Sequence, residues 1–123
     1  MATYSKLPLS QSSYGASITV VATGLTATGT LCHTIPISSG YMDETWIYAT
    51  NNTTSDLTLT MTYGKTNMTG DVLFYGVVDA YAGATLIVPG LILQGNSSYA
   101  PSIYAWGSAV SGINIFGYVN RIS

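Results

Sequence analysis

The sequence predicts an all-β fold, an antiparallel β-sandwich or jelly-roll of about eight strands. The first observation is a series of short apolar runs that alternate with Thr and are separated by Gly, Asn, Pro and Ser, which is typical of many short strands. The second is that no window of about eleven residues keeps a helical stripe free of Gly or of β-branched runs, so we expect almost no helix. The third is the brevity of the loops, which leaves no room for the crossovers that parallel strands need.

Each expected strand lies between two breaks in the chain. The clearest is Leu57–Tyr63, in which large apolar residues alternate with three Thr, so that the two kinds lie on opposite faces. The other strands are expected near residues 18–23, 28–35, 45–50, 72–78, 85–88, 98–105 and 110–119. The dipeptide Pro89-Gly90 is interpreted as a tight turn, because Gly allows a positive φ.

Residues 1–16 are expected to form an extended N-terminal arm, and residues 17–123 the β-sandwich domain. The arm contains Pro8 and Gly15 and shows no sustained period, and chain termini are disordered unless other contacts hold them. We predict that the arm docks on a neighbouring protein through four apolar or aromatic side chains: Tyr4, Leu7, Leu9 and Tyr14.

The composition argues for association with other proteins. Of the 123 residues, 47% are hydrophobic and only 7% are charged, against about 25% charged residues in an average soluble domain. A monomer with so little charge has little to keep it in solution, so we expect other subunits, or neutral Ser, Thr and Asn, to cover much of its surface. Three basic residues cannot form the phosphate-neutralising patch that nucleic-acid binding requires. No apolar run is long enough to span a membrane and the N-terminus lacks a secretory signal, so folding in a cytoplasm is expected.

The last expected strand carries large apolar groups on both faces. Ile113, Ile115 and Val119 share one face, and Phe116 and Tyr118 the other, although a sandwich strand usually has one polar face. Either loops cover the second face, or it is a contact between subunits, since aromatic residues are enriched at interfaces. The predicted subunit interface consists of the C-terminal aromatic residues Tyr99, Tyr104, Trp106, Phe116 and Tyr118.

The chain offers few groups for catalysis, and no known catalytic motif is present, so we expect no enzyme, no cofactor and no metal site. Cys32 and His33 are neighbours on one expected strand, so their side chains point to opposite faces and cannot pair. Cys32, the only cysteine, is interpreted as a small buried hydrophobe. His33 is interpreted as a partly buried or interfacial residue without an acidic partner. Asp43 and Glu44 are expected to diverge, as solvated carboxylates or as hydrogen-bond acceptors near a turn.

A carbohydrate-binding module remains an alternative. Trp46, Trp106 and ten tyrosines could stack on sugar rings. The feature that would favour this alternative is an exposed Trp46 or Trp106 in a shallow groove.

Four segments resemble a known family when their order and spacing are taken together. They are the run Asp-Glu-Thr-Trp-Ile-Tyr-Ala-Thr-Asn from Asp43 to Asn51, and the segments from Leu57 to Gly64, from Val88 to Leu93 and from Gly117 to Ile122. In this pattern the chain resembles small structural proteins from the virion gene clusters of tailed bacteriophages, which are head decoration (cement) proteins with a β-sandwich fold. The resemblance extends from about Leu7 to Ile122.

The resemblance implies a virion protein on the capsid surface, made in the host cytoplasm. It implies the major capsid protein as partner, a homotrimer, and a role in reinforcing the head, with no catalytic residues to carry over. The alternative within the same class is a tail- or neck-associated module of the virion, including one that binds carbohydrate.

Overall fold

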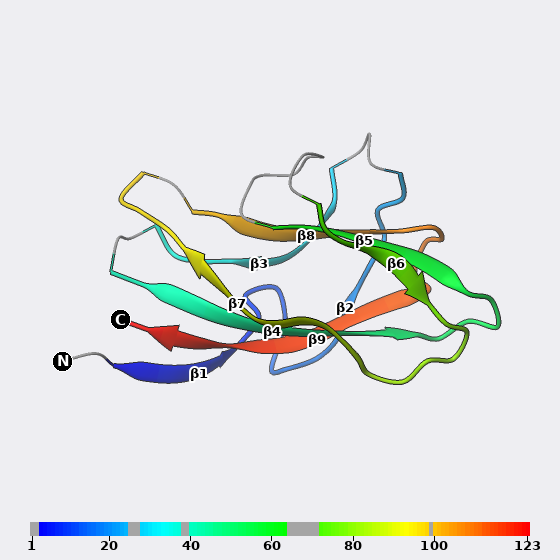
Figure 1. The fold of residues 1–123 in the computed structure, drawn as a ribbon, viewed down its shortest axis with the longest axis horizontal. Helices are drawn as coiled ribbons and strands as arrows, with labels where there is room; N and C mark the ends of the chain where they lie inside the picture. Colours follow the sequence, from blue (N-terminus) through cyan, green and yellow to red (C-terminus); the bar gives the residue numbers. More distant parts are fainter. Residues whose placement is uncertain (1–2, 25–27, 38–39, 64–71, 99) are drawn as a thin grey trace.

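The computed structural model describes residues 3–24, 28–37, 40–63, 72–98 and 100–123. Within these residues all regular structure is β-strand, and nine strands form two antiparallel sheets that pack face to face (Figure 1). The prediction of an all-β sandwich is therefore confirmed.

Sheet A has the strand order β1-β9-β4-β7, with the short β2 also paired to β9. Its strands are β1 (Tyr4–Pro8), β2 (Ile18–Thr19), β4 (Met42–Asn51), β7 (Thr85–Gln94) and β9 (Ile113–Ile122). Sheet B has the order β3-β8-β5-β6. Its strands are β3 (Thr30–Thr34), β5 (Leu57–Tyr63), β6 (Val72–Val78) and β8 (Ser102–Gly107).

The hydrophobic core lies between the two sheets and follows from alternation along each strand. In β4 every second residue from Asp43 to Asn51 is buried, and the residues between them are partly exposed. Ile47 and Val119 of sheet A and Leu59 and Met61 of sheet B are fully buried in this core. The side chains that lie between the buried ones along each strand point away from the core and form the outer face of each sheet.

Strand β7 runs through Pro89-Gly90, so the prediction of a tight turn at this dipeptide is wrong. Trp46 pairs with Pro89 and Thr45 pairs with Leu91, which leaves Gly90 as the extra residue of a bulge, with φ of 84°. Because β7 is the edge strand of its sheet, the missing N–H of Pro89 costs no ladder hydrogen bond. The ring of Trp46 lies over Gly90, where an added Cβ would come within 2.9 Å of it.

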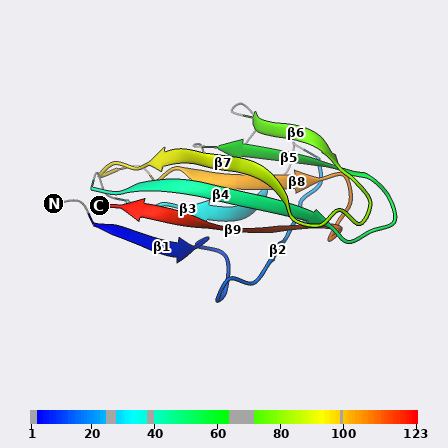
Figure 2. The same cartoon turned by 60° about the horizontal axis from the view of Figure 1, so that its bottom comes forward.

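The N-terminal segment belongs largely to the sandwich. Residues 4–8 pair with β9, and Leu9 is fully buried. Ser10 and Gln11 are hydrogen-bonded to β3, and residues 12–16 then form a loop that projects beyond β1 (Figure 2). Short hydrogen bonds shape this loop, from Ser12 N to Leu9 O at 2.9 Å and from Ser12 Oγ to Ala16 O at 2.6 Å. Only residues 12–16 of the segment expected to be an arm therefore project from the fold.

Candidate interaction surface

The outer face of sheet A carries a contiguous group of aromatic and aliphatic side chains. Trp46 of β4 lies opposite Tyr118 of β9, and their rings stack with centroids 6.5 Å apart and 13° between the planes. The next row places Tyr48 between Phe116 and Leu86. Register and alternation assign eleven apolar residues to this surface, called here the aromatic face: Tyr4, Pro8, Met42, Trp46, Tyr48, Leu86, Pro89, Ile92, Phe116, Tyr118 and Ile122.

Two opposite charges lie in one row across the aromatic face. Lys6 of β1 and Glu44 of β4 both pair with Asn120 of β9, one from each side. The ammonium of Lys6 lies 4.9 Å from the ring centroid of Tyr118. Glu44 Oε1 accepts hydrogen bonds from Trp46 Nε1 at 2.8 Å and from Asn120 Nδ2 at 3.0 Å. These two hydrogen bonds hold the pKa of Glu44 below its ordinary value.

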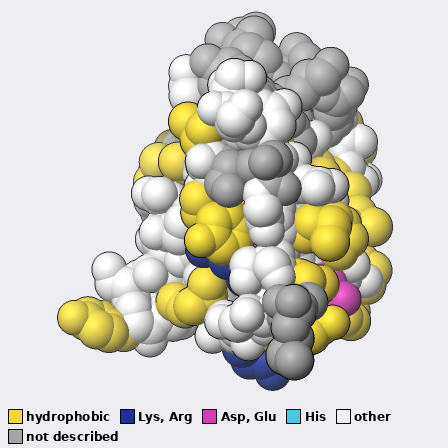
Figure 3. All heavy atoms as spheres, turned by 90° about the vertical axis from the view of Figure 1, so that its left-hand side faces the viewer, with side chains coloured by type: hydrophobic (Ala, Val, Ile, Leu, Met, Phe, Trp, Pro, Cys, Tyr) yellow, Lys and Arg dark blue, Asp and Glu magenta, His cyan; other side chains and the backbone are white. Residues whose placement is uncertain are grey.

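A hollow of about 530 Å³ lies where the projecting loop meets the aromatic face. Tyr14 at the loop tip is fully exposed, and its φ of 54° is in the left-handed region that non-glycine residues seldom adopt. In the end-on view of Figure 3, hydrophobic side chains form several separate groups among polar and backbone atoms, and few charged side chains are visible. The hollow is lined by Lys6, Leu7, Pro8, Tyr14, Gly15, Gly117 and Tyr118.

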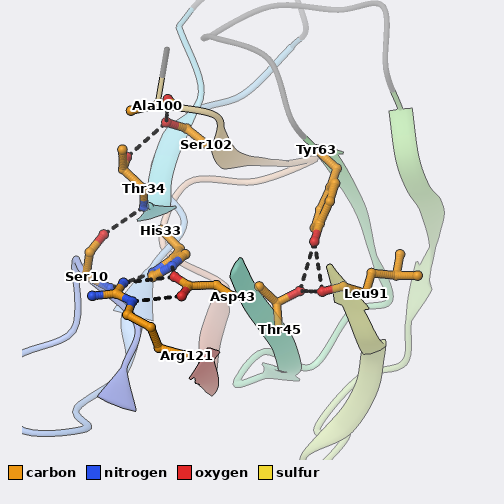
Figure 4. Close-up of polar contacts among 10 residues, drawn as sticks. All are labelled: Ser10, His33, Thr34, Asp43, Thr45, Tyr63, Leu91, Ala100, Ser102 and Arg121. Atoms are coloured by element: carbon orange, nitrogen blue, oxygen red, sulfur yellow. Dashed lines mark hydrogen bonds and ion pairs between the residues drawn. The ribbon is translucent and has the colours of Figure 1, made fainter. Parts of the chain in front are cut away.

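Beneath the aromatic face a buried carboxylate binds two cationic or hydrogen-bonding partners (Figure 4). Arg121 donates from Nε to Asp43 Oδ1 and from Nη2 to Asp43 Oδ2, each at 2.8 Å, which is a bidentate ion pair. His33 Nε2 lies 2.7 Å from Asp43 Oδ2. Burial opposes the ionisation of Asp43, but the hydrogen bonds from Arg121 and His33 outweigh it and hold the pKa of this carboxyl below its ordinary value.

The imidazole of His33 joins three parts of the molecule. Its Nδ1 accepts the backbone N–H of Ser10 at 3.0 Å, so Nε2 carries the proton that is donated to Asp43. Ser10 Oγ in turn accepts the backbone N–H of Thr34 at 2.8 Å. Both ring nitrogens are therefore engaged, and the loop after β1, strand β3 and strand β4 are tied together.

The sequence-based interpretations of His33 and Asp43 are corrected by this cluster. His33 does have an acidic partner, and Asp43 is fully buried instead of solvated. The partners of Asp43 are 10 and 78 residues away along the chain, and pairing at such distances leaves no local signal. Glu44 and Asp43 do diverge to opposite faces, as expected for neighbours on a strand.

A second polar contact joins the sheets near the edge strand β7 (Figure 4). Thr45 Oγ1 and Tyr63 Oη both donate to the carbonyl oxygen of Leu91, each at 2.9 Å. Burial raises the pKa of Tyr63 to about 12, so its hydroxyl keeps the proton that it donates. Burial likewise raises the pKa of the Cys32 thiol to about 12, which removes the thiolate that nucleophilic chemistry requires.

The described residues contain no group of three or more His, Cys, Asp or Glu side chains that could hold a metal ion. None of the described segments forms a helix long and apolar enough to cross a membrane.

The outer face of sheet B has a smaller hollow of about 260 Å³ beside Trp106. Thr58, Thr60 and Tyr75 line it as well. Trp106 is only 2% exposed, because Gly29 lies against its ring so closely that an added Cβ would come within 2.8 Å. The indole therefore offers little surface on which a sugar ring could stack.

The residues predicted to bind other proteins lie in several separate parts of the structure. Tyr4, Phe116 and Tyr118 all lie on the aromatic face, which therefore contains parts of both predicted contacts. Leu9 is buried in the core of its own chain, and Leu7 is half-buried against the core. Tyr14 lies on the projecting loop, and Tyr104 and Trp106 lie together on sheet B with ring centroids 6.5 Å apart. Tyr99 lies outside the described residues.

Sequence reasoning missed Lys6, Glu44, Trp46 and Tyr48 as members of the same surface. The signal was present in the strict alternation of β4, which places Glu44, Trp46 and Tyr48 on one face. Only the pairing of β4 with β9 shows that this face continues to Phe116 and Tyr118.

No family model matches the sequence, and no curated protein matches it. A chain in the structure of infectious bursal disease virus Gt strain superposes on this one with a TM-score of 0.48 and 8% sequence identity. The match covers 98% of this chain and 33% of that chain, so this chain spans about a third of the length of the viral one.

Proposed function

We propose that the chain is a structural protein of a virion that binds the outer surface of a phage capsid and reinforces it. The observation that carries this proposal is the aromatic face, where Trp46, Tyr48, Phe116 and Tyr118 form one contiguous surface. Monomeric soluble proteins rarely leave so large an apolar patch in water, and such patches mark sites of association. The resemblance also implies a homotrimer, a stoichiometry that the mass of the protein in solution tests.

The proposed role is adhesive and not catalytic. His33 and Asp43, the groups best suited to acid–base chemistry, are at most 1% exposed, and each is hydrogen-bonded to its own chain. This use of the titratable side chains supports a structural role, in which function comes from surfaces and not from a reactive centre.

The projecting loop is the proposed capsid contact. Tyr14 is fully exposed at its tip, and Tyr4 is 73% exposed on the adjoining strand. Leu7 and Leu9, which the sequence assigned to the same contact, instead anchor the base of the loop. A hydrogen-bonded loop of this kind, repeated in each subunit of an oligomer, would combine several modest contacts into strong binding through avidity.

The test is co-sedimentation of the purified protein with cognate capsids that lack it. Wild-type protein should bind saturably, and the variant Tyr14→Gly should bind at least about tenfold more weakly, because an exposed aromatic anchor is lost. The glycine adopts the positive φ of this position without cost, so the fold should be unchanged. Tyr81→Gly is the matched control, since Tyr81 is also exposed and has a φ of 55°.

Equal binding by the two variants would remove the loop from the contact. A wild-type protein that is present in intact virions but does not bind capsids would contradict the capsid role and favour the tail- or neck-associated alternative.

A further inference from the structure

We infer that the aromatic face binds a second copy of the chain, face to face, about a two-fold axis that runs parallel to β9 above Asn120. The inference rests on the proposed function only in assigning the face to association. It specifies what covers the face, it replaces the homotrimer that the resemblance implies by a dimer, and its test needs no capsid.

The charges on the face are complementary to themselves under this symmetry. Lys6 and Glu44 flank Asn120 in one row, on the strands to either side of β9. Strands lie about 4.8 Å apart, so each charge is about 5 Å from the line of β9, on opposite sides. A two-fold rotation about an axis along β9 exchanges the two sides, so Lys6 of each copy meets Glu44 of the other. The row then forms two intermolecular ion pairs around an Asn120–Asn120 contact.

These are the two charges that the described residues place on the face. Of the other charged residues in the described part of the chain, Asp43 and Arg121 lie on the inner side of sheet A, and Asp56 and Asp79 lie outside the strands. One positive and one negative charge at equivalent distances from a central strand is the pattern that an isologous contact requires, because the same patch serves both copies.

The apolar rows also match themselves under the same rotation. Tyr118 of one copy would meet Tyr118 of the other, and Pro8 would meet Trp46, since both pair with Tyr118 from opposite sides. Offset aromatic pairs are favourable contacts beyond the area that they bury. The partner's Trp46 would also cover the hollow of about 530 Å³ beside Lys6 and Pro8.

The part of the face that lies opposite itself under this rotation is centred on β9, with β1 and β4 on either side, because β7 has no counterpart beyond β1. Strand β1 has only five residues, so standard strand spacing and rise give this overlap a flat footprint of roughly 300 Å² per partner. This is below the about 800 Å² per partner of standard interfaces, so we expect a weak and reversible dimer.

The test is the solution mass of charge variants, measured by light scattering and sedimentation without any capsid. Wild-type protein should have twice the 12.9 kDa mass of one chain. Lys6→Glu and Glu44→Lys should each raise the dimer dissociation constant by about tenfold or more, because each places two like-charge pairs in the contact. An equimolar mixture of the two variants should form a heterodimer with wild-type affinity, because both pairs are then attractive.

Val77→Glu is the matched control, since Val77 is 60% exposed on the outer face of sheet B and should leave the dimer unchanged. Phe116→Arg, which would place two like charges face to face beside the axis, should leave only monomer. Circular dichroism of each variant establishes that the fold is retained.

A wild-type monomer or trimer, or a mixture of the two charge variants that does not associate, would overturn the inference. A dimer that does not bind capsids would support the inference and count against the proposed function. A monomer that binds capsids would overturn the inference and support the proposed function.

Discussion

Strand β4 of sheet A and strand β5 of sheet B are interior strands of their sheets, but they present different chemistry to the outside. Strand β5 of sheet B points Thr58, Thr60 and Thr62 outward, whereas β4 of sheet A points Trp46 and Tyr48 outward. Hydrogen bonds to water or to the chain itself can satisfy hydroxyl groups, whereas a large contiguous group of apolar side chains marks a surface that associates with another one. Alternation determines which side chains face the core. The chemical type of the outward side chains then indicates whether an outer face contacts water or another protein surface.

The inner faces differ as well. Beneath the aromatic face, the buried Asp43 and the partly exposed Arg121 form an ion pair between directly opposite residues of β4 and β9. The corresponding positions of β5 in sheet B are the apolar Leu59 and Met61. A slip of one residue between β4 and β9 would turn both charges away from each other, so the pair fixes the register on which the outer face depends.

Removing the buried charge of Asp43 should cause the largest loss of unfolding free energy. It also removes the ion pair that distinguishes the inner face of sheet A from that of sheet B. Asp43→Asn leaves Arg121 without its counter-ion. Breaking a fully buried pair typically costs about 3–5 kcal/mol of unfolding free energy, and the loss here should lie near the lower end of that range, because the side chain of Arg121 is partly exposed. Chemical denaturation at low protein concentration measures this loss. Glu44→Gln is the matched control, because it neutralises the adjacent carboxylate on the exposed side of the same strand, and its loss should be much smaller. Equal losses would mean that the buried pair does not stabilise sheet A.

The same carboxylate should make stability depend on acid pH. The folded-state pKa of Asp43 lies below the ordinary value of 3.8, so the unfolded chain takes up this proton first as the pH falls. The contribution of Asp43 is therefore complete above the unfolded pKa and is lost as the pH falls through the lower folded one. Denaturation midpoints measured from neutral pH down to strong acid should show this decline in the wild type. Asp43→Asn should show a shallower decline, and an unchanged slope would exclude Asp43 as its source.

The sequence predicted what local alternation encodes. Strand β5 was predicted with its observed ends, because apolar residues and Thr alternate without interruption from Leu57 to Tyr63. The two-sided character of β9 was also visible, since Phe116 and Tyr118 alternate with buried residues. Pro89-Gly90 was misinterpreted, because only the edge position of β7 allows a strand to continue through Pro.

The polar cluster could not be predicted, because its members are brought together by pairing between distant strands. His33 lies in sheet B and Asp43 and Arg121 in sheet A, on strands β3, β4 and β9. Nothing near His33 in the chain indicates an acid, and nothing near Asp43 indicates burial. The same holds for the aromatic face, whose halves on β4 and β9 are joined only by the register of these strands.

The smallest expected effect concerns an exception on the hydroxyl side of sheet B. Thr62 is only 1% exposed, and its Oγ1 has no hydrogen-bond partner in the described part of the chain. A buried hydroxyl without a partner costs stability, so Thr62→Val, which keeps the shape and removes the oxygen, should raise the unfolding free energy by about 1 kcal/mol. Thr58→Val on the same face is the control, because the side chain of Thr58 is half-exposed and its hydroxyl can reach water. Denaturation midpoints of the two variants measure the change in unfolding free energy. A loss of stability in Thr62→Val would mean that the hydroxyl of Thr62 is hydrogen-bonded in solution. A gain confined to Thr62 would sharpen the contrast between the sheets, since sheet B would then tolerate its polar outer residues only where water or a hydrogen-bond partner reaches them.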